Sequence, residues 1–451
     1  MESARADVVE SDDDGGSLVV RGVSVADGES LSVLAGSEDV RPSIVWQGPD
    51  ERVVGIGTAS TITASGTGRF ETVRRRAATL FADREVPPEL PAFARPRLFG
   101  GFAFYQGTRD RHDDPDWTGF PDAQFVLPAV SVIERDGERW LTASATGPNA
   151  ASEAERRLER WHSKPDEESG PEIAPPGIAD RHQLPERDAW TAQVEAAIDR
   201  VEEGELRKVV LAGAQAVDLR ENLSVRAAID RLGSTYPDCV RFAFRPEEPD
   251  AGTFFGATPE RLVTRRGRTV ETTALAGSTG RGETEDEDAW LAEQLRSSGK
   301  DSHEHALVVE AISEQLGDVA ETVETGDRTI RKLATVQHLQ TPIKATLAAD
   351  VHVLSLVEAL HPTPAVGGLP PDAALSAIRE AEAFDRGWYA APIGWFDPMG
   401  DGSFAVGIRS ALARGREATL FAGAGIVADS DPDAEWDEIQ LKYRPTLDAL
   451  R

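Results

Sequence analysis

The sequence is poor in several features that mark particular classes of protein. Cys239 is the only cysteine among 451 residues, which excludes an intrachain disulfide and leaves a core residue or, as the alternative, a reactive thiol. No apolar run approaches the ~18 residues of a transmembrane helix. Residues 1–16 are acidic and lack the basic start and apolar core of a secretory signal. We therefore expect a cytoplasmic protein with no membrane partner.

Positive charge is also scarce, and lysine most of all. The chain has 48 basic residues against 78 acidic ones, a net charge of −30. No basic stripe is present to neutralise phosphates, so nucleic acid is not an expected partner. An acidic, lysine-poor surface suits a salt-rich, halophilic cytoplasm, where screening reduces self-repulsion. The lysines are Lys164, Lys208, Lys300, Lys332, Lys344 and Lys442.

The patterning of the chain divides it into two parts. Residues 1–162 are rich in strand and turn signals. Residues 163–185 are rich in Pro, Glu, Asp and Gly, which predicts a linker or surface loop. Residues 186–451 hold strands and helices in mixed runs. This order favours an α+β fold over regular βαβ alternation.

Some elements of the second part can be predicted individually. Two long strands are expected around residues 402–413 and 416–427. The helix that follows has a clear start, because Asp431 can cap it and Pro432 suits its first turn. A helix is also expected over residues 187–204, where apolar side chains recur at helical spacing. These side chains are Trp190, Val194, Ile198 and Val201.

Two further segments carry acids three residues apart, Asp301 with Glu304 and Glu435 with Glu438. On a helix each pair lies along one face, with Lys442 one turn beyond the second pair. Carboxylate oxygens of this kind suit Mg²⁺, which binds through one or two carboxylates plus substrate and water. In so acidic a chain the same spacing also fits ordinary solvated helix faces, and both interpretations stay open.

Eight segments, in one order along the chain, carry a family resemblance. They are LRKVVLAG around Lys208, FFGATPERL (254–262), ETTALAGS (271–278), GKDSHEHALVV (299–309), VQHLQT (336–341), HPTPAVGG (361–368), FAVGIRSA (404–411) and GAGIVADSDPDAEWDEIQLK (423–442). Together they resemble the chorismate-utilising enzymes, namely the isochorismate, salicylate, anthranilate and aminodeoxychorismate synthases. The resemblance covers about residues 187–445, with a weaker one at 97–135.

The resemblance implies an α+β fold of two facing β-sheets covered by outer helices, in α/β/β/α layers, with the site between the sheets. Residues 1–162 would contribute to the first sheet rather than fold alone. Residues 186–451 would form the chorismate-binding catalytic region. This chain departs from the family pattern at Gly213, where many relatives have arginine, and at Thr258, where serine is commoner. Neither change removes an expected catalytic group.

Two positions indicate which nucleophile attacks the ring. Family members that add ammonia usually have glutamine where this chain has Lys208, and aminodeoxychorismate synthases often carry a nucleophilic lysine where it has Ala276. The resemblance thus implies attack by water, with Lys208 as its base. Partial burial beside a strand would help a lysine to lose its proton; a solvated lysine at a strand end is the alternative. No glutamine amidotransferase subunit is then expected.

The resemblance also assigns the other steps. Glu260 would protonate the leaving C4 hydroxyl, unless it is an ion-pair partner near Arg261. His338 would position or polarise the substrate near its ring carboxylate, unless it is only a packed, hydrogen-bonded histidine. Mg²⁺ would lie on Glu304 and Glu438, with Asp301 and Glu435 close by through metal-bound water. The implied substrate-binding residues are Tyr389, Arg409, Gly423, Gly425, Lys442 and Gly277.

The function that the resemblance implies is that of an isomerase, an isochorismate synthase. Water would add at C2 of chorismate as the C4 hydroxyl leaves, with Mg²⁺ bound, and the product would feed menaquinone synthesis. One alternative is a salicylate synthase, which goes on to eliminate pyruvate in the same site. Another is a non-catalytic chorismate-binding subunit, against which the intact Lys208 and Glu260 argue.

Overall fold

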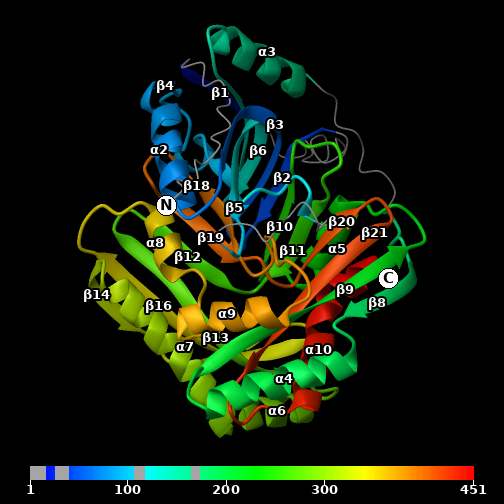
Figure 1. Ribbon diagram of the computed structural model, residues 1–451. Coiled ribbons are helices and arrows are strands. Elements are labelled where there is room, and N and C mark those ends of the chain that lie inside the picture. Colours follow the sequence, from blue (N-terminus) through cyan, green and yellow to red (C-terminus); the bar gives the residue numbers. More distant parts are fainter. Residues whose placement is uncertain (1–16, 26–39, 106–116, 164–172) are drawn as a thin grey trace, which may run out of the picture.

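A computed structural model describes residues 17–25, 40–105, 117–163 and 173–451 (Figure 1). These residues contain 21 strands, which hydrogen bonds join into one network. The helices are α2 (Arg69–Ala82), η1 (Ala92–Ala94, a 3-10 helix), α3 (Ala150–His162), α4 (Arg187–Glu202), α5 (Val225–Thr235), α6 (Glu285–Ser297), α7 (Gly299–Gly317), α8 (Val353–Leu360), α9 (Pro371–Ala381) and α10 (Pro432–Leu450).

The strand network has two branches, which we call the first sheet and the second sheet. They meet at β6 (Ala123–Arg135). Along the first sheet the order is β6, β3 (Glu51–Ala64), β2 (Ser43–Gln47), β10 (Val240–Arg245), β11 (Thr253–Thr258), β20 (Ser410–Arg414), β21 (Glu417–Ile426) and β9 (Lys208–Leu219). The far edge of β9 pairs with β8 (Ile178–Leu184) and β17 (Gly368–Leu369), and the other edge of β6 with β7 (Glu138–Ala145), then β1 (Leu18–Ser24) and β4 (Arg84–Glu85).

The second sheet begins where β5 pairs with the first residues of β6. Apart from the parallel β1–β4 contact, all pairings in both sheets are antiparallel. From β6 the order is β5 (Leu98–Phe102), β18 (Pro392–Phe396), β19 (Gly402–Val406), β12 (Arg261–Arg266), β13 (Thr269–Gly280) and β16 (Val336–Leu347), followed by β14 (Ala320–Thr325) and β15 (Thr329–Lys332).

Two short neighbouring segments carry the chain directly from one sheet to the other. It passes from β11 to β12 through Glu260, and from β19 to β20 through residues 407–409. Hydrogen bonds connect these crossings: the Val406 amide donates to the Glu260 carbonyl at 3.0 Å, and the Ala257 amide donates to the Arg409 carbonyl at 3.2 Å. Glu260 and Arg409 therefore lie where the two sheets part.

The prediction of a single strand over residues 402–413 is wrong, because this segment forms two strands. It consists of β19 and β20, which pair in different sheets and are separated by the crossing at 407–409. Arg409 has a φ of 52°, in the left-handed region that residues other than glycine seldom adopt. Such backbone strain occurs most often at functional sites, where the surrounding structure maintains it.

Helices cover the outer faces of the two sheets (Figure 1). α6 and α7 pack on β13 and β16 of the second sheet, whereas α4 and α10 pack on the first sheet around β9 and β21. α3 lies against β1 and β7. The predicted α+β class, with sheets inside and helices outside, is confirmed.

The N-terminal caps of α7 and α10 determine where the two pairs of acidic residues lie on these helices. The Ser298 hydroxyl accepts from the Asp301 amide at 3.1 Å at the start of α7. The carboxylate of Asp431 accepts from the Ala434 amide at 2.9 Å at the start of α10, as the sequence predicts. The caps set which residues fall on the inner face of each helix. Buried positions on these faces include Glu304 and Glu435.

The N-terminal strands pair directly with strands of the C-terminal part, β2 with β10 and β5 with β18. The linker predicted over residues 163–185 is wrong for residues 178–184, which form β8 along the edge of β9. Most side chains of β8 are exposed, so no apolar alternation marks it as a strand. Residues 164–172 of this prediction, and residues 1–16 with their lack of a secretory signal, lie outside the described residues.

The helix predicted over residues 187–204 is confirmed as α4, which buries Trp190 and Val194 in the core. Cys239 is buried in the main hydrophobic core. Burial raises the pKa of its thiol to about 11, so the reactive thiolate is disfavoured. The core interpretation of this cysteine fits the structure better than the reactive one.

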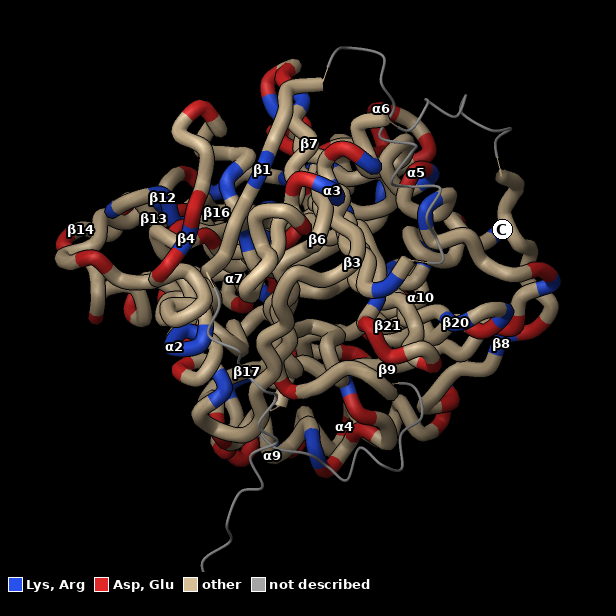
Figure 2. Tube along the Cα trace, turned by 90° about the horizontal axis from the view of Figure 1, so that it is seen from above, with Lys and Arg blue, Asp and Glu red and all other residues tan. Residues whose placement is uncertain are grey.

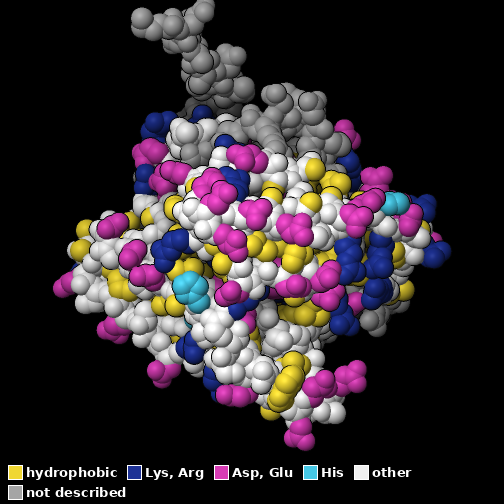
Figure 3. Space-filling view, turned by 60° about the horizontal axis from the view of Figure 1, so that its bottom comes forward, with side chains coloured by type: hydrophobic (Ala, Val, Ile, Leu, Met, Phe, Trp, Pro, Cys, Tyr) yellow, Lys and Arg dark blue, Asp and Glu magenta, His cyan; other side chains and the backbone are white. Residues whose placement is uncertain are grey.

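Charged residues lie mainly on peripheral helices and loops, around a central region with few of them (Figure 2). On the face shown in Figure 3, Asp and Glu side chains are spread widely, with Lys and Arg in smaller groups between them. None of the helices in the described part of the chain is both long and apolar enough to span a membrane.

Candidate active site

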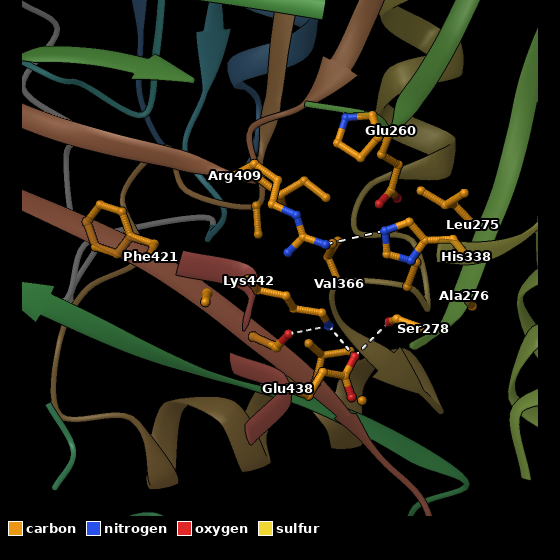
Figure 4. Close-up of a pocket in the computed structure, with 18 of the residues that line it drawn as sticks. Glu260, Leu275, Ala276, Ser278, His338, Val366, Arg409, Phe421, Glu438 and Lys442 are labelled. Atoms are coloured by element: carbon orange, nitrogen blue, oxygen red, sulfur yellow. Dashed lines mark hydrogen bonds and ion pairs between the residues drawn. The ribbon is translucent and has the colours of Figure 1, made fainter. Parts of the chain in front are cut away.

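One pocket lies between the two sheets, beside the crossings at Glu260 and Arg409, and most of the predicted site residues line it (Figure 4). Strands of the first sheet, strands of the second sheet and the helices α7 and α10 all contribute side chains. The predicted residues in its lining are Glu260, Gly277, Glu304, His338, Tyr389, Arg409, Gly423, Gly425, Glu438 and Lys442.

Lys208 is the first residue of β9, and only 1 % of it is exposed. Its Nζ lies 2.8 Å from Oε1 of Glu304 on α7, which lines the pocket. Gly425 on β21 makes this contact possible, because a Cβ there would lie 2.8 Å from Cε of Lys208 and 2.6 Å from Oε1 of Glu304. The alternative of a solvated lysine at a strand end is therefore wrong.

Glu260 enters the pocket from the crossing between β11 and β12 and is 6 % exposed. Burial raises the pKa of its carboxyl to about 7, against the opposing charges of Lys208 and two other cations of the site. At neutral pH such a carboxyl is partly protonated and can act as a general acid. Arg261, its proposed alternative partner, instead lies 3.5 Å from Glu271.

His338 and Arg409 form one side of the pocket, and Figure 4 shows the contact between them. Nη2 of Arg409 donates to Nε2 of His338 at 3.4 Å. Burial, helped by the charges of Arg409 and Lys442, lowers the pKa of His338 well below its usual value, so the ring is neutral. Opposite His338 the strand β13 has a bulge at Gly277, whose φ of 76° suits glycine. The histidine is thus both packed and directed into the pocket.

Lys442 and Glu438 lie one turn apart on α10, with their charged groups 2.6 Å apart. The Lys442 ammonium also donates to the Gly423 carbonyl at 2.7 Å, and the Ser278 hydroxyl donates to Glu438 at 2.7 Å (Figure 4). Burial alone would raise the pKa of Glu438, but the Lys442 ion pair and the Ser278 hydrogen bond outweigh it and lower the pKa. The carboxylate is therefore ionised and available to a cation.

Tyr389 reaches the pocket just before β18. Its ring stacks on Phe421 of β21, with the ring centroids 5.1 Å apart. A Cβ at Gly423 would lie 3.1 Å from the Tyr389 hydroxyl, so a larger residue on β21 would press on the tyrosine. Burial raises the pKa of Tyr389, which keeps its hydroxyl protonated as a hydrogen-bond donor.

Asp301 and Glu435, the first acid of each i, i+3 pair, lie outside the lining. Glu435 is buried and holds Lys300 at 2.6 Å, while burial and the neighbouring Glu438 raise its pKa. Burial also raises the pKa of Asp301. Among the described residues no group of three or more Asp, Glu, His or Cys could hold a metal by itself. Besides the proposed acid Glu260, the carboxylates in the described lining of the pocket are those of Glu304 and Glu438.

Ser278, Phe421 and Arg386 are the polar and aromatic residues of the described lining that the sequence did not predict. Ser278 contacts Glu438, Phe421 stacks on Tyr389, and Arg386 is completely buried behind the pocket wall. Ser278 lies within a quoted segment, and its position beside Gly277 was the available signal. The roles of Phe421 and Arg386 depend on contacts between distant elements that no local pattern shows.

Comparison with known proteins identifies the family. A sequence model of the family described as chorismate binding enzyme matches residues 8–451. The chain belongs to this family of chorismate-binding enzymes. Its relatives include the salicylate biosynthesis isochorismate synthase of Pseudomonas aeruginosa, 39% identical over 436 residues that cover 94% of this chain and 88% of the relative. Isochorismate synthase MenF of Bacillus subtilis is 34% identical, covering 90% of this chain and 87% of that protein.

Solved structures of chorismate-binding enzymes share the fold. MenF, the menaquinone-specific isochorismate synthase of Escherichia coli, superposes with a TM-score of 0.81 at 26% identity, covering 97% of this chain and 95% of that one. Anthranilate synthase component I of Streptococcus pneumoniae shares only the fold, with a TM-score of 0.71 at 20% identity over 88% of this chain and 92% of that one. The predicted family membership is confirmed.

Proposed function

We propose that this chorismate-binding enzyme is an isochorismate synthase in which Lys208 is the general base and Glu260 the general acid. The proposal depends chiefly on one observation: Glu260 lines the pocket, and the buried Lys208, just outside the lining, contacts the lining residue Glu304 at 2.8 Å. The charge of Lys208 acts on Glu260, yet burial still keeps the pKa of Glu260 near 7. A buried amine and a buried carboxyl that are close enough to interact suit one proton removal and one proton delivery.

The cations of the pocket support a substrate with two carboxylates. Arg409 and Lys442 supply positive charge, and the Tyr389 hydroxyl can donate a hydrogen bond. Gly423 and Gly425 of β21 line the same pocket, and their lack of side chains lets the Tyr389 hydroxyl and the Lys208–Glu304 pair pack closely against this strand. We assign the enolpyruvyl carboxylate to this group of residues, and the ring carboxylate to the side of His338.

The same pocket fits Mg²⁺. Glu304 and Glu438 already hold cations, the ammonium groups of Lys208 and Lys442, at 2.8 and 2.6 Å. Two carboxylates with substrate and water are a usual ligand set for Mg²⁺. When bound there, the ion would polarise the ring carboxylate of the substrate and make the ring more electrophilic. We propose that Asp301 and Glu435 act less directly, through water.

The reaction then needs one proton taken and one given. Lys208, as the neutral amine rather than the ammonium, accepts a proton at Nζ from water as the water oxygen bonds to C2, the ring double bond shifts, and the C4–O bond breaks. The Glu260 carboxyl protonates the departing C4 oxygen, which leaves as water. Water thus enters and leaves, and the product is an isomer of the substrate. Lys208 stands where ammonia-adding relatives usually have glutamine, and Ala276 lies in the lining where aminodeoxychorismate synthases often have lysine, so no amidotransferase partner is proposed.

Identification of the product tests this proposal. Pure protein should convert chorismate to isochorismate in the presence of Mg²⁺ and adequate salt, measured by chromatography and mass spectrometry. Release of salicylate and pyruvate would instead support the salicylate synthase alternative. Binding of chorismate without turnover would support a non-catalytic subunit.

We propose menaquinone synthesis as the pathway, because one similar structure is that of a menaquinone-specific enzyme. Another relative is named for salicylate biosynthesis, so the pathway needs its own test. Expression of this chain should restore menaquinone to a bacterial strain that lacks its menaquinone-specific isochorismate synthase. Failure to do so with an active, expressed protein would refute this assignment and leave the reaction unaffected.

A further inference from the structure

The strand β9, which begins with Lys208, is incompletely paired along one edge. Its other edge pairs with β21 from Val209 onward. On the incomplete edge, β17 pairs with Lys208 and Val209, and β8 begins only at Ala214. Within the part of the chain that the structure describes, no strand pairs with residues 210–213 on that edge. Backbone groups in such a gap still need hydrogen-bond partners.

A buried ion pair fills this gap. Nη2 of Arg386 donates to the Val210 carbonyl at 2.7 Å, and Oε1 of Glu382 accepts from the Ala212 amide at 2.9 Å. Nε of Arg386 donates to the other carboxylate oxygen of Glu382 at 2.9 Å. Both side chains are buried, the guanidinium completely. Two side chains after α9 thus supply the hydrogen bonds that a neighbouring strand would have made.

Arg386 connects β9 with two other parts of the pocket wall. Its Nη1 donates to the Val366 carbonyl at 2.8 Å, and its own carbonyl accepts from the Tyr389 amide at 2.7 Å. Val210, Val366 and Tyr389 all line the pocket, where Figure 4 shows Val366. Lys208 lies two residues before Val210, so the two side chains leave the same face of β9.

We propose that the Glu382–Arg386 pair positions the general base Lys208, by holding the start of β9 against the segments that carry Val366 and Tyr389. The inference rests on the proposed function, in which Lys208 acts on water. Arg386 is a positioning residue in this scheme, because it acts through Lys208. A planar guanidinium can reach several acceptors at once, whereas a lysine ammonium at the same place cannot reproduce that fork.

The first experiment compares Arg386→Lys and Glu382→Gln with a matched control, Arg265→Lys. Arg265 is also buried and lies 2.9 Å from Asp401, but it does not line the pocket. We expect the first two variants to lower kcat by about 10- to 100-fold, since small misplacements of a catalytic group cost that much. The KM for chorismate should stay within about threefold. Arg265→Lys should lower the melting temperature with kcat unchanged.

The second experiment places each variant in a Lys208→Ala background. If the ion pair acts through Lys208, Arg386→Lys or Glu382→Gln should cause no further loss of the residual rate. An equal loss in both backgrounds, or a kcat within about twofold of wild type, would overturn the proposal. Should Arg386→Lys not fold, Glu382→Gln carries the test, because its amide oxygen can still accept from Ala212. If the wild-type protein formed no isochorismate, the proposed function itself would fail, which product analysis shows separately.

Discussion

The lysines of the site and those of the surface form the same kind of ion pair in very different surroundings. Lys208, Lys300 and Lys442 each hold a glutamate at 2.6–2.8 Å within or beside the pocket. Lys344 holds Glu271 at a similar 3.0 Å, but 66 % of its side chain is exposed. An exposed pair contributes about 0–1 kcal/mol, whereas loss of one partner from a buried pair costs about 3–5 kcal/mol. The site lysines and the surface lysine therefore differ in burial rather than in the length of their ion pairs.

The largest contrast is expected when the two groups are mutated in parallel. Lys208→Ala should lower the rate of isochorismate formation by about 10²–10⁴-fold, because it removes the proposed base. Lys344→Ala, the matched surface change, should leave the rate unchanged. Steady-state assays of both purified variants test this. A Lys208→Ala enzyme with more than about a tenth of wild-type rate would contradict the role of Lys208.

The glutamates that hold these lysines should differ in the same way. Chelation by EDTA should abolish activity and Mg²⁺ should restore it. Glu304→Gln and Glu438→Gln should each weaken Mg²⁺ binding by at least about 10- to 100-fold, since each removes a proposed ligand. Isothermal titration with Mg²⁺ measures the affinity without turnover, and Glu271→Gln serves as the surface control. Unchanged affinity in either pocket variant would refute the metal assignment.

Burial of Glu260 leads to a prediction about pH. The proposed acid must carry its proton, and its pKa of about 7 means that the protonated fraction falls as pH rises above 7. The kcat of the wild type relative to that of a variant without the acid should therefore decline above that pH, by about tenfold per unit at its steepest. Glu260→Gln should be slow throughout and lack this decline. A ratio of wild-type to Glu260→Gln kcat that stays level from pH 7 to 9 would show that Glu260 is not the acid, because the ratio cancels the titration of the base Lys208.

The choice of nucleophile sharpens the comparison between buried and exposed lysines. A buried lysine can activate water as a general base, but it activates ammonia little. Excess ammonium salt should leave isochorismate as the product, with no anthranilate or aminodeoxy compound formed. In ¹⁸O-labelled water, mass spectrometry should find one label, on the C2 hydroxyl. An unlabelled product would mean that the substrate hydroxyl migrates, and Lys208 would then have no water to activate.

The smallest effect is expected at the surface. Lys344→Ala should change the free energy of unfolding by less than about 1 kcal/mol, and this difference should shrink in ~1 M salt, where exposed charges are screened. The same salt should stabilise the wild-type protein, because its net charge of −30 repels itself. Urea unfolding at low and high salt measures both quantities. A protein equally stable at both would contradict the prediction of a halophilic surface.

The sequence predicts the helices better than the contacts between them. The i, i+3 spacing of acids and the cap at Asp431 correctly place residues on α10. The pairing of Glu435 with Lys300 is invisible in the sequence, because the two residues are 135 positions apart on different helices. The left-handed conformation of Arg409 is hidden as well, since the apolar pattern runs on through residues 402–413. Local patterns report which face of an element is buried, not which distant group it meets.

The pairing of β5 with β18 has a consequence for the synthesis of the protein. Strand β5 is made early, but its partner on that edge appears only near residue 392, and Glu438 and Lys442 later still, on α10. A ribosome-bound chain must therefore keep one edge of β5 unpaired for most of translation, and one edge of β2 until β10 is made. Unpaired strand edges favour aggregation, and long-range pairings slow folding. Refolding yields should accordingly fall as protein concentration rises, and no shortened chain that ends before α10 should acquire activity.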